Sequence, residues 1–189
     1  MNKNTSIIVL FCTLLPLFLV LFSYKAVLFF TPLTESQEET LQFLDGDLAE
    51  VPYPLTPEER SHLADVERVM TGINAVFYAL LLALTLLLTY TWKQPQFQKK
   101  LFRFGGITTL AFGIILLFFI LFSFTSSFTL FHQLFFPQGN WLFPESSFLI
   151  QMFPIHFFTA AARNIFLVLL GLGSLFILLS LLWKHDSPS

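Results

Sequence analysis

Four long apolar stretches constrain the fold of this sequence more than any other feature. They cover roughly residues 7–30, 69–92, 104–127 and 160–183. A helix needs about 20 apolar residues to cross the hydrocarbon core of a bilayer. The expected fold class is therefore an all-α membrane protein with four transmembrane helices. Only 12% of the residues are charged, about half the share that covers a soluble domain, which excludes an ordinary soluble globule.

The distribution of basic residues predicts the topology. Six of them lie beside the termini or in the loop between the second and third stretches: Lys3, Lys93, Lys99, Lys100, Arg103 and Lys184. Cytoplasmic loops carry an excess of Lys and Arg, so both termini are expected in the cytoplasm. Loops 31–68 and 128–159 then face outward. The sequence has no internal repeat, so residues 1–189 are expected to form a single membrane domain with a small extracytoplasmic cap made by these two loops.

The first outer loop, residues 31–68, is polar and acidic. It holds ten acidic residues and two arginines, which gives a net charge of −8. Thr34 with Gln37, and Thr56 with Glu59, have the spacing of capping boxes at helix N-termini. We therefore expect short helical structure in this loop, on the solvent side of the membrane.

The second transmembrane helix is expected to extend beyond the bilayer. Pro57 suits the first position of a helix, and the pattern continues to about Trp92. A helix of this size is about 54 Å long, whereas the hydrocarbon core is about 30 Å thick. Its first turns must stand above the membrane, with His62, Asp65 and Val69 on one face.

The second outer loop, residues 128–159, is rich in phenylalanine and has Glu145 as its only acid. A large apolar loop is not left exposed to water. We expect it to lie in the membrane interface or against the bundle, where aromatic side chains are favoured and where membrane lipids contact the protein.

Common catalytic and binding motifs are missing from the sequence. It has no serine nucleophile elbow, P-loop, zinc-protease helix or dinucleotide fingerprint. Cys12 is the only cysteine, so an intramolecular disulfide is excluded. We expect no metal site and no cofactor. The net charge of −2 offers no basic excess, so nucleic acid is not an expected partner.

His62 and His132 are the strongest candidates for chemistry. His62 precedes the second apolar stretch and His132 follows the third, so the topology places both at the outer end of the bundle. A histidine can act as general acid or base near neutral pH, although an isolated interfacial histidine is more often an amphipathic residue without a catalytic role. Asp65, one turn after His62, could orient its imidazole or could simply solvate the helix face.

Several segments resemble a known family. They read HLADV at 62–66, FHQLFF at 131–136, NWLF at 140–143 and LIQMFP at 149–154. Together with the four-span pattern, they resemble the lipoprotein intramolecular transacylase (Lit) family of Gram-positive bacteria. The resemblance implies a multi-pass protein of the bacterial cell membrane with its active site at the extracytoplasmic face.

The resemblance also implies a reaction and a partner. Members of this family act on diacylglyceryl-modified lipoproteins, and move the sn-2 acyl chain to the α-amino group of the N-terminal cysteine. The family's two catalytic histidines match His62 and His132. No enzyme nucleophile is needed, because the attacking amine is tethered to the ester.

These observations give one hypothesis for the site. His62 and His132 form a general base and acid pair, and Asp65 orients His62. A further set of residues is expected to bind the substrate head group and acyl chains: Tyr53, Arg68, Phe135, Phe136, Asn140 and Trp141. A monomer is the simplest expectation for the oligomeric state.

Two other function classes remain open. A non-enzymatic membrane adaptor or chaperone could bind a basic partner through the acidic loop 31–68. Neutralising the acids of that loop would then abolish function, while both histidines would be dispensable. A transporter is less favoured, because no transmembrane stretch carries a convincing ionisable pair.

Overall fold

The computed structural model describes residues 2–183, apart from the side chain of Phe122. Lys184, one of the basic residues used for the topology, lies outside this range. Over the described residues the chain is helical and contains no strand. The four long helices are α1 (Lys3–Phe30), α3 (Pro57–Tyr90), α4 (Pro95–Phe122) and α7 (Ile155–Leu182), and the short ones are α2 (Glu35–Asp45), α5 (Phe124–Phe135) and α6 (Phe148–Met152). All four long helices are apolar enough to cross a membrane, which confirms the predicted fold class.

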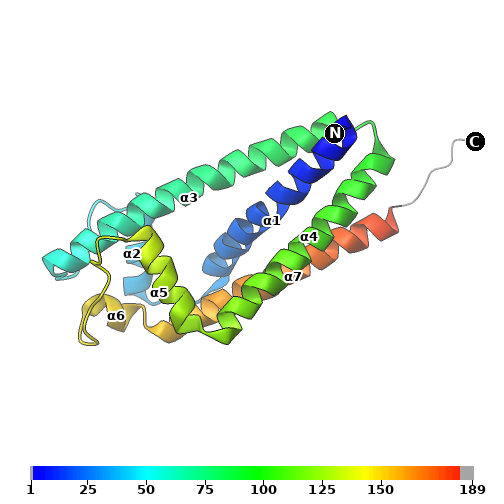
Figure 1. Ribbon diagram of the computed structural model, residues 1–189. Coiled ribbons are helices and arrows are strands. Elements are labelled where there is room, and N and C mark those ends of the chain that lie inside the picture. Colours follow the sequence, from blue (N-terminus) through cyan, green and yellow to red (C-terminus); the bar gives the residue numbers. More distant parts are fainter. Residues whose placement is uncertain (1, 184–189) are drawn as a thin grey trace, which may run out of the picture.

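The long helices form an uneven bundle. α4 and α7 pack against each other along most of their length, and α1 packs against both. α3 is held mainly by α1 and α2, and it diverges from α4 toward the end that carries the short helices (Figure 1). A shared apolar core joins the four helices: Phe11, Leu15, Leu19, Leu84, Leu101, Phe166 and Leu169.

The short helices build a cap at one end of the bundle. α2, the first turns of α3 and α6 share a second apolar core: Leu44, Val51, Leu55, Leu63 and Leu149. Both predicted capping boxes are present, from Thr34 to Gln37 and from Thr56 to Glu59. The start of α1 and the α3–α4 turn lie at the opposite end (Figure 1), where Lys3 contacts the face of Tyr90.

α3 begins at Pro57, as predicted, and ends at Tyr90. Its 34 residues are about 51 Å long, which exceeds the ~30 Å hydrocarbon core. The segment from Val69 onward is uncharged and forms the membrane-spanning part of the helix. The turns from Pro57 to Arg68 are charged and belong to the cap. His62 therefore lies outside the membrane-spanning segment.

The third long helix ends earlier than the sequence predicted. The apolar stretch was expected to continue to residue 127, but α4 ends at Phe122 and Ser123 is extended. The Ser123 hydroxyl accepts a hydrogen bond from Ser126 N at 3.2 Å and starts α5. Serine side chains compete in this way with helical hydrogen bonds. As a result α5 turns back from the end of α4 toward α3 (Figure 1).

Close packing between α4 and α7 depends on a glycine. A Cβ at Gly106 would lie 2.7 Å from the carbonyl oxygen of Gly173 and 2.7 Å from Ile177 Cγ1. Gly171 has no atom within 4 Å of the same position. Both glycines are in helices, so alanine improves local helix propensity equally at the two sites.

We therefore expect Gly106→Ala to destabilise the protein by about 1–3 kcal/mol, because the two helices must move apart. Gly171→Ala is the matched control and should be neutral or slightly stabilising. Thermal unfolding of both variants in the same detergent measures the difference. Equal melting temperatures for the two variants would contradict the packing role of Gly106.

Candidate active site

Two histidines from distant parts of the chain lie together at the capped end of the bundle. His62 is on the second turn of α3, and His132 is in the last turn of α5. Their ring centroids are 6.1 Å apart, with an angle of 28° between the ring planes. His62 is buried and His132 is half-buried. The structure thus brings together the two imidazoles that the sequence singled out.

Aromatic side chains surround the pair. The buried Phe136 ring meets both imidazoles, at 4.8 Å from His62 and 5.6 Å from His132. Phe143 lies edge-on to His62 at 5.6 Å, and Trp141 lies 4.9 Å from His132. These rings replace water with apolar surface around much of the histidine pair.

The tautomer of His132 follows from a hydrogen bond to the backbone. Its Nδ1 lies 2.9 Å from the carbonyl oxygen of Phe128. A carbonyl oxygen only accepts hydrogen bonds, so Nδ1 must carry the proton. In the neutral ring Nε2 is then unprotonated and can accept a proton from a bound molecule.

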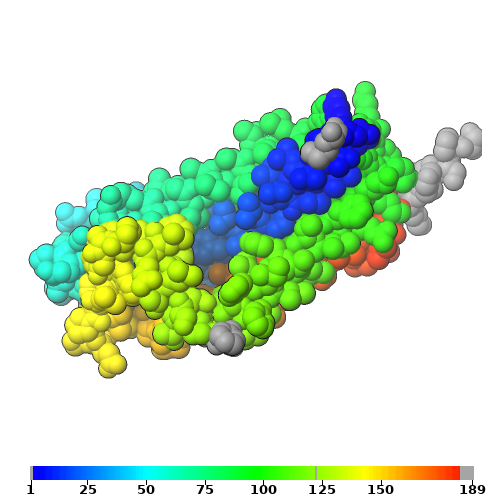
Figure 2. Space-filling model, viewed as in Figure 1, coloured from blue at the N-terminus to red at the C-terminus, as the bar shows by residue number. Residues whose placement is uncertain are grey.

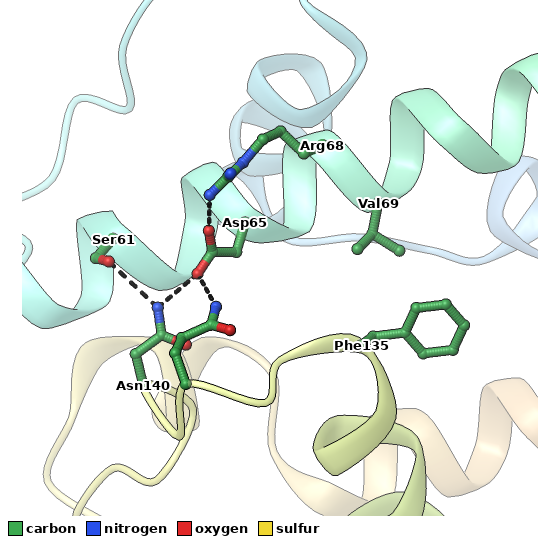
Figure 3. Close-up of a pocket in the computed structure, with 7 residues that line it drawn as sticks. Ser61, Asp65, Arg68, Val69, Phe135 and Asn140 are labelled. Carbon is green, nitrogen blue, oxygen red and sulfur yellow. Dashed lines mark hydrogen bonds and ion pairs between the residues drawn. The ribbon is translucent and has the colours of Figure 1, made fainter.

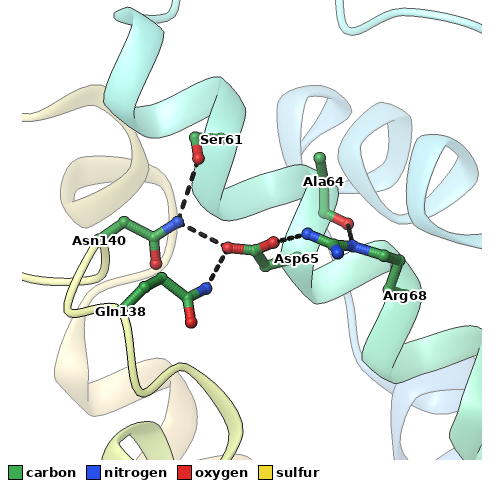
Figure 4. A network of polar contacts seen from close by, with 6 residues as sticks. All are labelled: Ser61, Ala64, Asp65, Arg68, Gln138 and Asn140. Atoms are coloured by element: carbon green, nitrogen blue, oxygen red, sulfur yellow. Dashed lines mark hydrogen bonds and ion pairs between the residues drawn. The ribbon is translucent and has the colours of Figure 1, made fainter.

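The Asp65 carboxylate is the centre of a polar network (Figure 4). Its Oδ1 pairs with the Arg68 guanidinium, and its Oδ2 accepts a hydrogen bond from the Gln138 side chain. Oδ2 also accepts from Asn140 Nδ2 at 2.6 Å, and the same nitrogen donates to Ser61 Oγ at 3.2 Å. These contacts tie the loop between α5 and α6 to α3.

The prediction that Asp65 orients His62 needs a link between the two side chains. Within residues 2–183 no hydrogen bond joins them directly, because the carboxylate faces Arg68, Gln138 and Asn140. The side chain of Asn140 does affect His62, because it acts to raise the pKa of that imidazole, against the larger lowering by burial. Asp65 can therefore influence His62 through Asn140.

A pocket of about 440 Å³ opens beside this network. Asp65, Arg68 and Asn140 lie at its polar end, while Val69 and Phe135 lie at its other, apolar end (Figure 3). Such walls suit an amphipathic ligand whose polar and apolar parts adjoin. Among residues 2–183, no three His, Cys, Asp or Glu side chains converge as a metal-binding group.

Burial dominates the titration of both histidines. It lowers the pKa of His132, and the hydrogen bond to Phe128 opposes this effect only in part. Burial also lowers the pKa of His62, and the neighbouring His132 lowers it further, while Asn140 acts in the opposite direction. Both rings are therefore neutral at pH 7, which is the form that accepts a proton.

Glu59, one turn before His62, is a buried carboxylate that serves two helices. Its Oε2 accepts from Thr56 N at 2.8 Å and completes the capping box of α3. Its Oε1 accepts from the Ser147 hydroxyl at 2.6 Å and from Leu149 N at 3.2 Å, at the start of α6. Burial by itself raises the pKa of Glu59, but these hydrogen bonds together lower it. The ionised carboxylate holds α6 against α3.

The six residues predicted to bind the substrate divide into two groups. Five contact an imidazole or line the pocket: Arg68, Phe135, Phe136, Asn140 and Trp141. Tyr53 lies instead in the cap core, with its ring 5.1 Å from Phe148, and does not line this pocket. The Tyr53 hydroxyl is buried and has no hydrogen-bond partner among residues 2–183.

Sequence reasoning missed Ser61, Gln138 and the tertiary contacts of Glu59. A local signal existed for Gln138, because it lies between Pro137 and a glycine, Gly139, whose φ is +79°. Proline and glycine in this arrangement indicate a turn. The partner of that turn on α3 could not be found in the same way, because it depends on how α5 folds back.

Comparison with known proteins decides the family. The family model for the lipoprotein intramolecular transacylase Lit matches residues 37–158. The match covers well over half of the chain, and includes both histidines and the Asp65 network. The chain belongs to the lipoprotein intramolecular transacylase family.

Solved structures agree with this assignment at the level of the fold. The in meso structure of the membrane integral lipoprotein intramolecular transacylase Lit from Bacillus cereus matches with a TM-score of 0.79 and 23% identity, over 93% of each chain. Two structures of the same protein with one histidine replaced, by arginine or by alanine, have TM-scores of 0.78 and 0.77 at 23% identity. They cover 95% and 94% of this chain, and 91% of their own. No curated protein matches the sequence.

Membership of the Lit family makes this chain an acyl-transferring enzyme that acts on lipoproteins. The four long apolar helices make it a multi-pass membrane protein.

We expect Glu59→Ala to destabilise the cap by about 2–4 kcal/mol, because two backbone donors and a hydroxyl lose their buried acceptor. Glu58→Ala is the matched control, since Glu58 is a neighbouring but exposed acid of the same helix turn. Thermal unfolding in detergent compares the two variants. An equal loss of thermal stability in both variants would show that the hydrogen bonds of Glu59 do not hold α6 against α3.

Proposed function

We propose that this member of the Lit family moves the acyl chain from the sn-2 ester of a diacylglyceryl-modified cysteine to the α-amino group of the same cysteine. The product is an N-acyl, lyso-glyceryl lipoprotein. The observation that carries the proposal is the pair of imidazoles, with ring centroids 6.1 Å apart, at the boundary between the cap and the membrane-spanning bundle. An N-terminal lipid-modified cysteine occupies the same boundary, with its acyl chains in the bilayer and its peptide outside.

The proton balance explains why two bases are present. The substrate amine is mostly an ammonium group at neutral pH, with a pKa of about 8. Formation of the amide removes two protons from that nitrogen. One proton must reach the glyceryl oxygen when the ester C–O bond breaks, and the other leaves to solvent. Two imidazoles that are neutral before the reaction can accept these protons, and one can return its proton to the leaving oxygen.

The surroundings of the histidines fit the same reaction. The unprotonated Nε2 of His132 is available as a base. The rings of Phe136 and Trp141 exclude water near the pair, and exclusion of water favours attack by the tethered amine over hydrolysis of the ester.

The pocket supplies complementary walls for the substrate. We assign the glyceryl head group to its polar end, at Arg68, and the adjoining acyl chain to its apolar end, at Phe135. Figure 2 shows the surface hollowed beside α5, between α5 and α4, with α1 at the back of the hollow. An acyl chain can extend from the pocket toward the bilayer along this side.

We also propose an orientation in the membrane. The cap and the histidine pair face the outside of the bacterial cell, and both termini face the cytoplasm. The basic residues Lys93, Lys99 and Lys100 support this orientation, because they lie at or beside the start of α4, at the end away from the cap, and positive charge favours the cytoplasmic side.

Replacement of His62 or His132 by alanine tests the proposal. Each change should lower the transfer rate by about 100-fold or more, as is typical for positioned acid–base groups. The measurement is mass spectrometry of the N-terminal peptide of a diacylglyceryl lipoprotein co-expressed with each variant. Transfer gives an isomer of unchanged mass in which fragmentation locates one acyl chain on the amine.

His156→Ala is the matched control, because His156 lies in the first turn of α7 on the capped side but does not line the pocket beside Asp65. Its transfer rate should equal that of the unmodified protein. Transfer that persists in the folded double variant of His62 and His132 would overturn the proposed roles. Unmodified diacyl product from the unmodified enzyme would overturn the proposed reaction.

The pH dependence of kcat/KM should show two separate bends. Below about pH 8 the rate falls tenfold per pH unit as the substrate amine is protonated. The histidines add a second loss only below their ordinary value of 6.5, because both have a lowered pKa in the folded protein. A synthetic diacylglyceryl cysteine peptide in detergent provides the assay. A second bend above pH 6.5 would contradict the electrostatic description of the pair.

A further inference from the structure

The orientation of the Asn140 amide is set by its neighbours. Its Nδ2 lies 2.6 Å from Asp65 Oδ2 and 3.2 Å from Ser61 Oγ (Figure 4). An ionised carboxylate has no proton to donate, so the amide nitrogen and not the oxygen must face Asp65. Both N–H donors of the amide are then occupied, and the carbonyl oxygen Oδ1 is turned away from the carboxylate.

That oxygen is a buried acceptor without a partner. Asn140 Oδ1 and His62 Nδ1 are both buried, and neither has a hydrogen-bond partner within the described residues. The hydrogen bonds of Asn140 to Ser61 and Asp65, which precede and follow His62 on α3, place its amide beside this histidine. In agreement with that position, the side chain of Asn140 acts to raise the pKa of His62. Buried polar atoms are seldom left unpaired, so we infer that the two groups pair with each other in a state in which Nδ1 of His62 carries a proton, as it always does in the imidazolium.

We propose that Asn140 is a positioning residue that connects Asp65 to His62: the carboxylate holds the amide so that its carbonyl oxygen accepts a hydrogen bond from His62 when that imidazole is protonated. The inference rests on the proposed function in that His62 gains a proton during acyl transfer. It changes the expected role of Asn140 from binding the head group to supporting a histidine.

The charges around His62 explain why an amide suits this position. The titratable groups near the ring are His132 on α5, and Asp65 with its ion-pair partner Arg68 on α3. Glu59, one turn earlier, is directed toward α6. Arg68 balances the charge of Asp65, so His62 meets the dipole of Asn140 and not a bare carboxylate. A neutral acceptor supports a transient imidazolium without holding its proton permanently.

The test measures the apparent pKa of His62 directly, from the pH dependence of its carbethoxylation by diethyl pyrocarbonate, followed by peptide mass spectrometry. The full-length protein in detergent is used throughout. Asn140→Leu has a similar size but no acceptor, and should lower the apparent pKa of His62 and reduce kcat about 10-fold or more with little change in KM. Asp65→Asn should shift the pKa in the same direction, because the amide of Asn140 loses its fixed orientation.

Asn140→Asp is the conservative variant. Next to Asp65 one of the two carboxyl groups will keep a proton, so an oxygen at residue 140 can still donate to Asp65 while the other faces His62. This variant should keep the apparent pKa of His62 at or above that of the unmodified protein, and should retain more activity than Asn140→Leu. It also serves if Asn140→Leu does not fold.

Gln138→Leu is the matched control. Gln138 also donates to Asp65 Oδ2 but makes no contact that raises the pKa of His62. Its loss should leave the apparent pKa of His62 unchanged. An unchanged pKa of His62 in Asn140→Leu, a lowered pKa in Asn140→Asp, or a shift in Gln138→Leu equal to that in Asn140→Leu would overturn the proposal whatever the activities are. The expected pKa shifts in a protein that transfers no acyl chain would support the link and overturn the proposed reaction instead.

Discussion

Two buried carboxylates on one face of α3 hold the site together. Glu59, His62 and Asp65 follow one another at three-residue steps and so share a face of the helix. Glu59 binds the start of α6, and Asp65 binds the loop that follows α5. The segment that carries the aromatic rings is thus attached on both sides of His62. Buried carboxylates are stable here because hydrogen-bond donors surround them, and the position of the histidine pair depends on these attachments.

The length of α3 places this face where the cap joins the membrane-spanning part of the helix. Because the helix is longer than the hydrocarbon core, its charged turns stand in the cap while the uncharged part begins at Val69, one turn beyond Asp65. Polar and apolar environments therefore meet within a single turn of the helix. A lipid-modified protein presents the same change, from peptide to acyl chain, over a comparable distance. The proposed transfer from ester to amine at that junction needs no motion of either group into the bilayer core.

Much of the fold could be predicted from local patterns. The apolar stretches, the capping boxes at Thr34 and Thr56 and the start of α3 at Pro57 all depend on residues within a few positions of one another. The end of α4 was predicted wrongly because hydropathy alone does not register that the Ser123 side chain can start a new helix. That break turns α5 back toward α3 and brings His132 beside His62. The wrongly predicted end of α4 therefore concealed α5, the helix that completes the site.

The sequence by itself determined the number of membrane-spanning helices, the protruding polar end of α3 and the presence of two histidines on one side of the membrane, because hydrophobicity and helix geometry act over short separations. Only the tertiary structure decided the contacts among these groups. Asp65 accepts hydrogen bonds from Asn140 and Gln138, Glu59 accepts one from Ser147, and the two imidazoles lie side by side among aromatic rings. These pairings join residues far apart along the chain, and their formation depends on the packing of whole helices, which no local pattern specifies.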